Sequence, residues 1–92
     1  MSEVVIVPNP DVMGSRTGSL EDLSKDDIVR ILGFEPNVED DPYKVVNSWG
    51  FTINGIECAV WDYKGSHKYK QWSTFGPDEA LRLVFGTFYR GE

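Results

Sequence analysis

The dipeptide Asn54-Gly55 constrains the fold more than any other feature of the chain, because it separates two runs rich in β-branched and aromatic residues. A type I′ turn needs positive φ at both central positions, and Asn-Gly adopts it most readily. A two-residue connection also fixes the register of the strands that it joins. We therefore predict an antiparallel hairpin with strands over 43–53 and 56–64.

This register divides the side chains of the hairpin between two faces. One face carries the cross-strand pairs Ile53 with Ile56, Phe51 with Cys58, Trp49 with Val60, and Asn47 with Asp62. These pairs are almost wholly apolar, so this face should pack on the core. The opposite face carries mostly small and polar residues together with Trp61 and Tyr63, and it should be turned away from the core.

Two segments show the caps and the apolar spacing of short helices. In the first, Ser24 is a favourable N-cap and Gly33 is a natural residue to end the helix. This helix would begin earlier if Ser19 were the cap. In the second, Pro77 suits the first helical position and Gly86 ends the apolar pattern. Each helix should bury one apolar face.

The order of these elements predicts an α+β fold. After a turn over 64–67, residues 68–75 can return as a third antiparallel strand and complete a three-stranded β-meander. Two short helices packed on one face of this meander give a two-layer domain with the order α-β-β-β-α. The run that ends at Pro8 can add an N-terminal strand, or 1–18 can form a flexible arm. In both cases 19–92 form a single α+β domain.

Composition and charge exclude several classes of protein. The single cysteine, Cys58, cannot form an intramolecular disulfide, and we expect a cytoplasmic location. No apolar run approaches the ~20 residues of a membrane span, so we expect no membrane partner. The net charge of −6 disfavours direct binding to nucleic acid, because such binding neutralises phosphates with basic residues.

Acidic residues are concentrated in the first half of the chain. The densest of them form a candidate acidic surface: Glu21, Asp22, Asp26, Asp27, Glu35, Glu39, Asp40 and Asp41. Such a surface could steer the chain toward a basic partner. It could also imitate the phosphate row of a nucleic acid. An ordinary solvated surface accounts for the same residues.

Catalytic and metal-binding patterns are weak. Cys58 and His67 are the residues that could act as nucleophile and base. The hairpin places Cys58 on the core face and His67 in a turn beyond the strand, roughly 10 Å or more away at ~3.3 Å per residue. One cysteine and one histidine do not make a zinc site. We expect no enzyme activity, no metal and no cofactor.

The stretch WDYKGSHKYKQW, over 61–72, is the densest aromatic and basic segment of this acidic chain. It supplies the candidate partner-binding residues Trp61, Tyr63, Trp72, Lys64, Lys68 and Lys70. Tryptophan and tyrosine are favoured anchors of protein interfaces. Aromatic residues beside lysines can also stack on a nucleotide or another small ligand. A third interpretation is that the chain ends or a homodimer partner cover this face.

From Ser48 onward the chain resembles small proteins encoded by tailed bacteriophages. The resemblance rests on a W-x-F strand, a G-x-x-C-x-x-W-D-Y strand and a final W-S-x-F-G-P before a short helix, and it covers 30–86. It implies a phage accessory protein in the bacterial cytoplasm, and such proteins commonly inhibit host proteins, including defence systems. We therefore predict a non-enzymatic protein-binding module that modulates a host protein. The alternatives are a ligand- or nucleotide-binding module and a nucleic-acid mimic.

Overall fold

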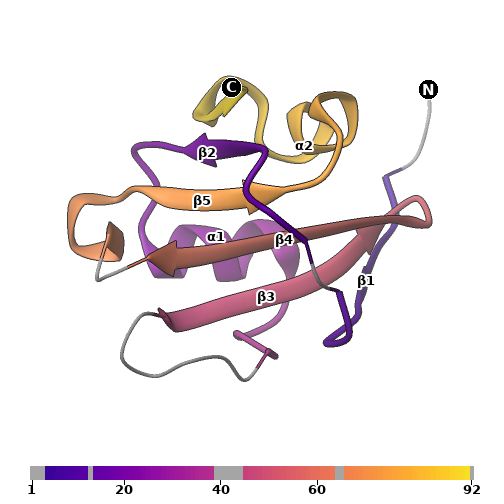
Figure 1. The fold of residues 1–92 in the computed structure, drawn as a ribbon, viewed down its shortest axis with the longest axis horizontal. Helices are drawn as coiled ribbons and strands as arrows, with labels where there is room; N and C mark the ends of the chain where they lie inside the picture. Colours follow the sequence, from indigo (N-terminus) through magenta and orange to yellow (C-terminus); the bar gives the residue numbers. More distant parts are fainter. Residues whose placement is uncertain (1–3, 13, 39–44, 64–65, 92) are drawn as a thin grey trace.

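A computed structural model describes residues 4–12, 14–38, 45–63 and 66–91, which form a small compact α+β protein (Figure 1). The strands of this part of the chain form one antiparallel six-stranded sheet in the order β1-β3-β4-β5-β2-β6. In chain order the elements are β1 (Ile6–Pro8), β2 (Gly18–Leu20), α1 (Lys25–Leu32), β3 (Val45–Ile53), β4 (Ile56–Tyr63), the 3-10 helix η1 (Ser66–Tyr69), β5 (Trp72–Phe75), α2 (Asp78–Phe85), the 3-10 helix η2 (Gly86–Phe88) and β6 (Tyr89–Gly91).

The predicted hairpin is confirmed as β3 and β4. Asn54 and Gly55 have φ values of 51° and 84°, as the turn requires. Ile53 pairs with Ile56, Phe51 with Cys58, and Trp49 with Val60. The register shifts by one residue between Val45 and Ser48. Beside this irregularity the buried carboxylate of Asp62 accepts hydrogen bonds from the backbone N and from Nδ2 of Asn47, at 2.7 and 3.2 Å.

The predicted meander is present as β3-β4-β5, but it is only part of the sheet. Residues 66–69 form η1 instead of the start of the third strand, and Lys70 has a positive φ of 59°. The strand β5 therefore begins only at Trp72. At the N-terminus, the added strand is confirmed as β1, which pairs with β3.

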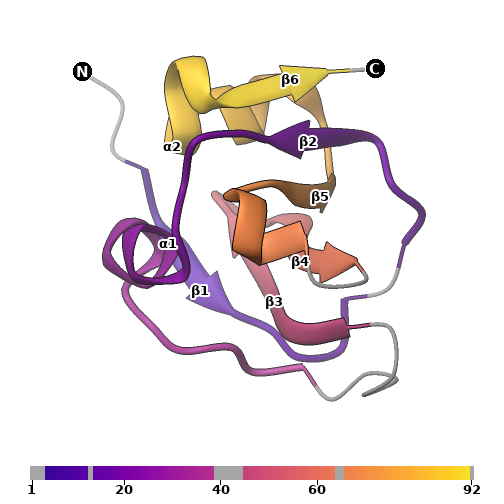
Figure 2. The same cartoon turned by 90° about the vertical axis from the view of Figure 1, so that its left-hand side faces the viewer.

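Two three-residue strands complete the sheet, and the sequence patterns did not indicate them. Ser19 lies in β2 and not at a helix cap, and β2 is inserted between β5 and β6. Figure 2 shows β2 and β6 running side by side. The flexibility of 1–18 stays a prediction.

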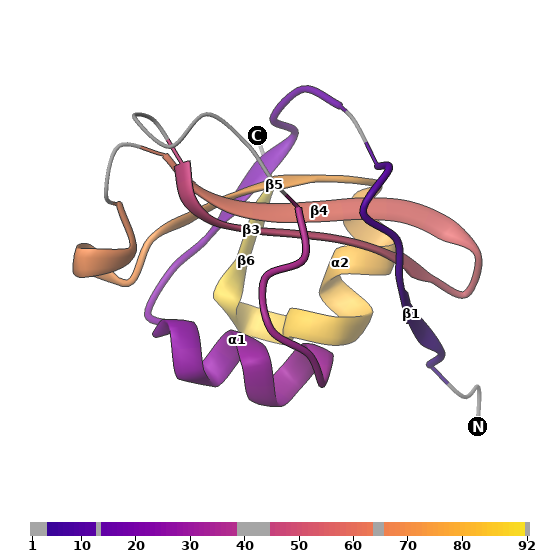
Figure 3. The ribbon, with the colours of Figure 1, turned by 90° about the horizontal axis from the view of Figure 1, so that it is seen from below.

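Both helices lie on the same side of the sheet (Figure 3). At the start of α1, Ser24 Oγ accepts a hydrogen bond from Asp27 N, and the Asp27 carboxylate accepts one from Ser24 N. Gly33 ends α1 in the left-handed conformation at φ 92°. The predicted bounds of α1 are therefore confirmed, and α2 follows Pro77, which is its N-cap residue.

The side of the sheet that faces the helices, here called the inner face, carries the core. Trp49 and Trp72 meet edge to face with ring centroids 5.3 Å apart, and both are buried. Their indole N–H groups donate to backbone carbonyls, Trp49 to Phe34 at 3.0 Å and Trp72 to Leu23 at 2.7 Å. These two large side chains thus bury their rings in the core with their donors satisfied.

Two polar side chains also lie on the inner face. Tyr89 is buried, donates to Asp78 Oδ1 at 2.5 Å, and lies under the guanidinium of Arg82, whose carbon is 5.5 Å from the ring centroid. The hydroxyl of Thr74 is buried, and it has no hydrogen-bond partner among the described residues. The hydroxyl of Tyr89 is therefore satisfied, whereas burial of the Thr74 hydroxyl costs its free energy of hydration.

The open edge of β3 is covered in two ways. Asn54 N donates to Val5 O and Asn9 N to Gly50 O, both at 2.8 Å, so these residues bond toward β3. Along an antiparallel strand, alternate residues direct their backbone N–H and C=O to opposite sides. Pro8 lies next to Asn9 and therefore faces away from β3, and a proline has no N–H to offer there. Beyond β1, the amide of Asn37 bonds both the N and the O of Gly50, each at 2.9 Å. Asn37 thus takes the place of a strand residue.

Candidate functional site

The outer face of the sheet, opposite the helices, carries the candidate site. Strand pairing aligns one row of residues across five strands, from β3 to β6: Ser48, Trp61, Ser73, Ser19 and Arg90. Figure 1 looks onto this face, with α1 behind the sheet. The row consists of three serines, the half-buried Trp61 and, at its β6 end, the exposed Arg90.

Trp61 lies where the hairpin register predicted, but Trp72 does not lie beside it. Ser73 is the β5 residue that pairs with Trp61, and adjacent strand residues point to opposite faces. Trp72 is therefore directed to the inner face, where it is 1% exposed. Its expected position on the partner-binding face is wrong. The register of the third strand was open in the sequence because no two-residue turn precedes it.

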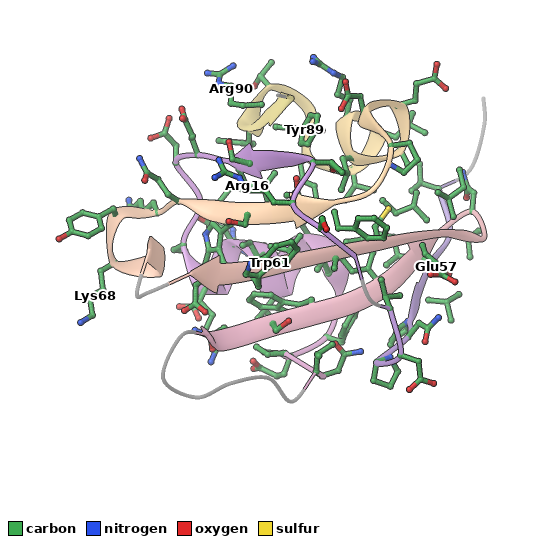
Figure 4. The ribbon with its side chains drawn as sticks, viewed as in Figure 1. Arg16, Glu57, Trp61, Lys68, Tyr89 and Arg90 are labelled. Carbon is green, nitrogen blue, oxygen red and sulfur yellow. The ribbon has the colours of Figure 1, made fainter. Side chains whose placement is uncertain are left out.

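The other predicted partner-binding residues are not gathered around Trp61. Lys68 and Lys70 are exposed, and Figure 4 labels Lys68 at η1, beyond the end of the sheet. The hydrogen bonds from Ser24 are the main cause of the lowered pKa of Asp27 in α1. The positive charges of Arg30 and Lys70 lower this pKa further. Lys64 and the side chain of Tyr63 lie outside the described residues.

A shallow depression of about 220 Å³ adjoins the Trp61 row over β2 and β5. It is lined by Arg16, Ser19, Leu20, Glu21, Gln71, Trp72 and Ser73. Figure 4 labels Arg16 at the β2–β5 pair and Trp61 on the neighbouring strand β4. Ser73 belongs to the lining and also pairs with Trp61, so the depression lies on the strand next to that of Trp61.

The charges around the depression are partly compensated. Arg16 Nε donates to the carbonyl of Gly18 at 3.2 Å, which holds the guanidinium over β2. Arg90 forms an ion pair with Glu21 at 3.6 Å. The charged residues that line the depression itself are Arg16 and Glu21.

The candidate acidic residues are divided between different parts of the molecule. Glu21 borders the depression, whereas Asp27 caps α1 and Glu35 lies 3.8 Å from the ammonium group of Lys25. Asp22 and Asp26 are exposed, and 39–41 lie outside the described residues. The five candidate acidic residues that the structure describes thus do not form a continuous row of carboxylates.

Two segments cover part of the outer face, and Ser48, at the β3 end of the Trp61 row, is buried. The chain after β1 lies close to β3, where a Cβ on Gly50 would collide with the Asn9 carbonyl oxygen. Further along, Gly14 contacts the ring of Phe75 on β5. The chain itself therefore covers the outer face near Gly50 and Phe75. Trp61 is half-buried.

Cys58 is buried on the inner face, as the register predicted. Burial raises the pKa of its thiol to about 11, which disfavours the reactive thiolate. Gly76 packs directly against its sulfur, since a Cβ on Gly76 would lie 2.7 Å from Sγ. Cys58 is thus enclosed in the described structure.

No three histidine, cysteine, aspartate or glutamate residues in the described ranges lie close enough to hold a metal ion. None of the described helices is long and apolar enough to cross a membrane.

Comparison with protein-family models, with curated proteins and with solved structures found no match to this chain.

Sequence reasoning found Trp61 but missed the residues that surround it. Arg16 lies in a turn-rich stretch, and Arg90 lies in the C-terminal tail. Ser19 was considered only as a helix cap. These residues meet through strand pairs that span more than fifty positions in the chain, and no local pattern signals such pairs.

Proposed function

We propose that this chain is a non-enzymatic protein-binding module that contacts its partner through the outer face, with Trp61 as the anchor. The observation that carries the proposal is the contrast between the three tryptophans. Trp49 and Trp72 are fully enclosed by the core, whereas Trp61 is half-buried among small polar residues on the opposite face. Tryptophan is enriched among residues that dominate binding energy at protein interfaces.

The shape of the site favours a protein partner over a small ligand. Pockets that hold drug-sized ligands enclose about 300–1,000 Å³ and bury most of the ligand. The depression beside Trp61 is smaller, at about 220 Å³. A surface with one aromatic ring and a polar surround is typical of a protein interface.

The partner we propose is a host protein, and the effect is inhibition or modulation, including of a defence system. This part of the proposal is supported by the resemblance of 30–86 to small tailed-phage proteins. It places the interaction in a bacterial cytoplasm. Homodimer formation through the same face is the variant of this proposal.

Affinity capture tests the proposed function directly. Tagged wild type, Trp61→Ala and Ser73→Arg would be incubated with bacterial lysate, and the recovered proteins quantified. Leu83→Ala is the matched control, because Leu83 is 57% exposed on α2, on the helix side of the sheet. We expect a protein recovered by wild type and by the control, and lost with both outer-face variants.

The paired variants separate binding from folding. Trp61→Ala removes an aromatic ring, whereas Ser73→Arg adds bulk and charge at the neighbouring position of the row. Circular dichroism would confirm that both remain folded. Equal recovery of every protein by wild type and both folded variants would exclude the outer face as the contact surface. A doubled mass of the wild type in solution, returning to monomer with Ser73→Arg, would identify the homodimer.

A further inference from the structure

The 3-10 helix η1 carries an exposed aromatic side chain at one end of the molecule. Tyr69 is 78% exposed, more than any other large hydrophobic side chain in the described part of the chain. Lys68 and Lys70, its neighbours in the chain, are exposed as well. Figure 1 shows η1 at one end of the long axis, and Figure 4 shows Lys68 directed away from the sheet. These three residues, Lys68, Tyr69 and Lys70, are here called the η1 tip.

The backbone at the base of the η1 tip has a conformation that a lysine adopts only at a cost. Lys70 has a φ of 59°, in the left-handed region that glycine enters without strain. Its carbonyl accepts a hydrogen bond from Leu23 N at 3.3 Å, and the carbonyl of Leu23 accepts one from the indole of Trp72 at 2.7 Å. Strained residues are concentrated at sites of binding and switching. A lysine at this position therefore favours a role for its side chain.

The charge of the η1 tip is opposite in sign to the net charge of −6. No ion pair within the described ranges involves Lys68 or Lys70. Lys70 interacts electrostatically with Asp27, but this carboxylate is also ion-paired with Arg30 at 3.6 Å. A partner surface that carries carboxylates would thus be attracted to the tip and repelled by the acidic remainder of the chain. Such a contrast in charge orients a partner as it approaches.

We propose that the η1 tip is a second interaction surface, which binds an acidic segment of a protein. The ring of Tyr69 contacts an apolar side chain of that segment, and the ammonium groups of Lys68 and Lys70 pair with its carboxylates. Tyrosine is a favoured anchor of protein interfaces, and a polar rim usually surrounds such an anchor. This surface goes beyond the proposed function, because it lies at η1 and does not include Trp61.

Single-stranded nucleic acid offers a similar combination of aromatic rings and negative charge. Two features of the η1 tip favour a peptide instead. Two lysines neutralise few phosphates, and affinity for nucleic acid depends on the number neutralised. Asp22 is exposed and precedes Leu23, so it adds negative charge at the base of the tip. A continuous row of phosphates would meet this charge, whereas a short peptide can place its carboxylates at the lysines alone.

Two synthetic peptides and one oligonucleotide test the η1 tip with the full chain. Acetyl-Asp-Glu-Phe-Glu-Asp-amide, its uncharged twin acetyl-Asn-Gln-Phe-Gln-Asn-amide and a short oligothymidylate would be titrated separately into the ¹⁵N-labelled protein at 0.15 M NaCl. The resonances to follow are the backbone N–H groups of Lys68, Tyr69 and Lys70, with the indole N–H of Trp61 as the outer-face reference. We expect the acidic peptide to shift the tip and to bind about fivefold more tightly than its twin, as two exposed charge pairs allow.

Variants of the tip separate binding from stability. Tyr69→Ala should weaken binding of the acidic peptide about fivefold, and Tyr69→Phe should keep it within about twofold of wild type. Lys70→Gly should weaken binding about twofold and yet raise the denaturant concentration at the midpoint of unfolding, because glycine adopts φ 59° without strain. Arg82→Gln is the matched control, since it removes an exposed cation on α2, away from η1 along the long axis (Figure 1).

Several outcomes would overturn the proposal. Equal binding of the two peptides, or an equal loss with Arg82→Gln and Lys70→Gly, would show that the tip does not select carboxylates. Unchanged binding by a folded Tyr69→Ala would exclude the ring as the anchor. Tighter binding of the oligothymidylate would identify a nucleic-acid contact, and no shift of the tip at millimolar peptide would exclude the surface. Lysate capture with Trp61→Ala decides the proposed function separately.

Discussion

The inner and outer faces of the sheet are built from alternating residues of the same strands, yet their side chains differ in size and burial. On β3 and β4 the inner face buries Trp49, Phe51 and Val60 completely, whereas the outer face carries mostly small or polar residues. Trp61 is the exception on the outer face. Since the inner face already supplies a closed aromatic core, the comparison teaches that Trp61 is not needed to complete that core and can serve contact with a partner.

Alanine substitution of the two tryptophans on neighbouring strands gives the largest test of this comparison. Trp72→Ala should lower the free energy of unfolding by about 4 kcal/mol, because it leaves a cavity beside Trp49. Trp61→Ala should lower it by about 2 kcal/mol, because part of the indole is already in contact with solvent. Denaturant unfolding of both variants measures the difference. Equal losses would show that Trp61 belongs to the core.

Asn37 tests how much the edge of the outer face contributes to stability. Asn37→Ala should lower the free energy of unfolding by about 2 kcal/mol, because Gly50 N loses its hydrogen-bond partner and Gly50 O keeps only the bond from Asn9 N. Glu35→Ala in the same loop is the control, and it should change stability by about 0.5 kcal/mol or less. If Asn37→Ala leaves the free energy of unfolding unchanged, water replaces the amide at this edge.

Thr74 and Ser73 are neighbours on β5 that point to opposite faces. Here we expect a substitution on the inner face to increase stability, in contrast to the substitutions above. Thr74→Val should raise the free energy of unfolding by about 1 kcal/mol, because it removes a buried hydroxyl that has no partner in the described structure. Ser73→Val, on the half-buried outer side, should change it by about 0.5 kcal/mol or less. A loss of stability in Thr74→Val would show that the hydroxyl is satisfied.

Tyrosine ionisation gives the smallest effect, since it leaves stability at neutral pH unchanged. Burial and the hydrogen bond to Asp78 raise the pKa of Tyr89 from 10.0 to about 12, and Tyr69 is 78% exposed. A raised pKa in the folded state means that the neutral phenol stabilises the fold fully below pH 10. This contribution is lost as pH rises toward 12.

Ultraviolet titration of phenolate absorbance measures the raised pKa of Tyr89. Tyr89→Phe should remove the decline in stability that ionisation of Tyr89 causes at alkaline pH. If Tyr89 ionises near pH 10 while the protein remains folded, the Tyr89–Asp78 contact is weaker than the structure indicates.

The hairpin and both helices could be predicted because their signals are local. Asn54-Gly55 specifies the turn and the register of β3 and β4, and the caps of α1 at Ser24 and Gly33 lie within ten positions of each other. The register in turn gave the orientation of Trp61. In each case a few adjacent residues determine the backbone conformation.

The rest of the sheet and of the candidate site depends on contacts distant in the sequence. The strands β2 and β6 have three residues each, too few to show an alternating pattern. The 3-10 helix η1 changed the start of β5, and a shift of one residue exchanges the two faces of a strand. This is why Trp72 was assigned to the wrong face and why Arg16 was not connected with Trp61.

The covered edge of β3 has a consequence for assembly. Proteins with a long unpaired edge strand are liable to join edge to edge and to aggregate. Here Pro8 removes a donor from the outer side of β1, and Asn37 occupies the backbone of Gly50 beyond it. Strand addition and fibre growth are therefore disfavoured along this described edge.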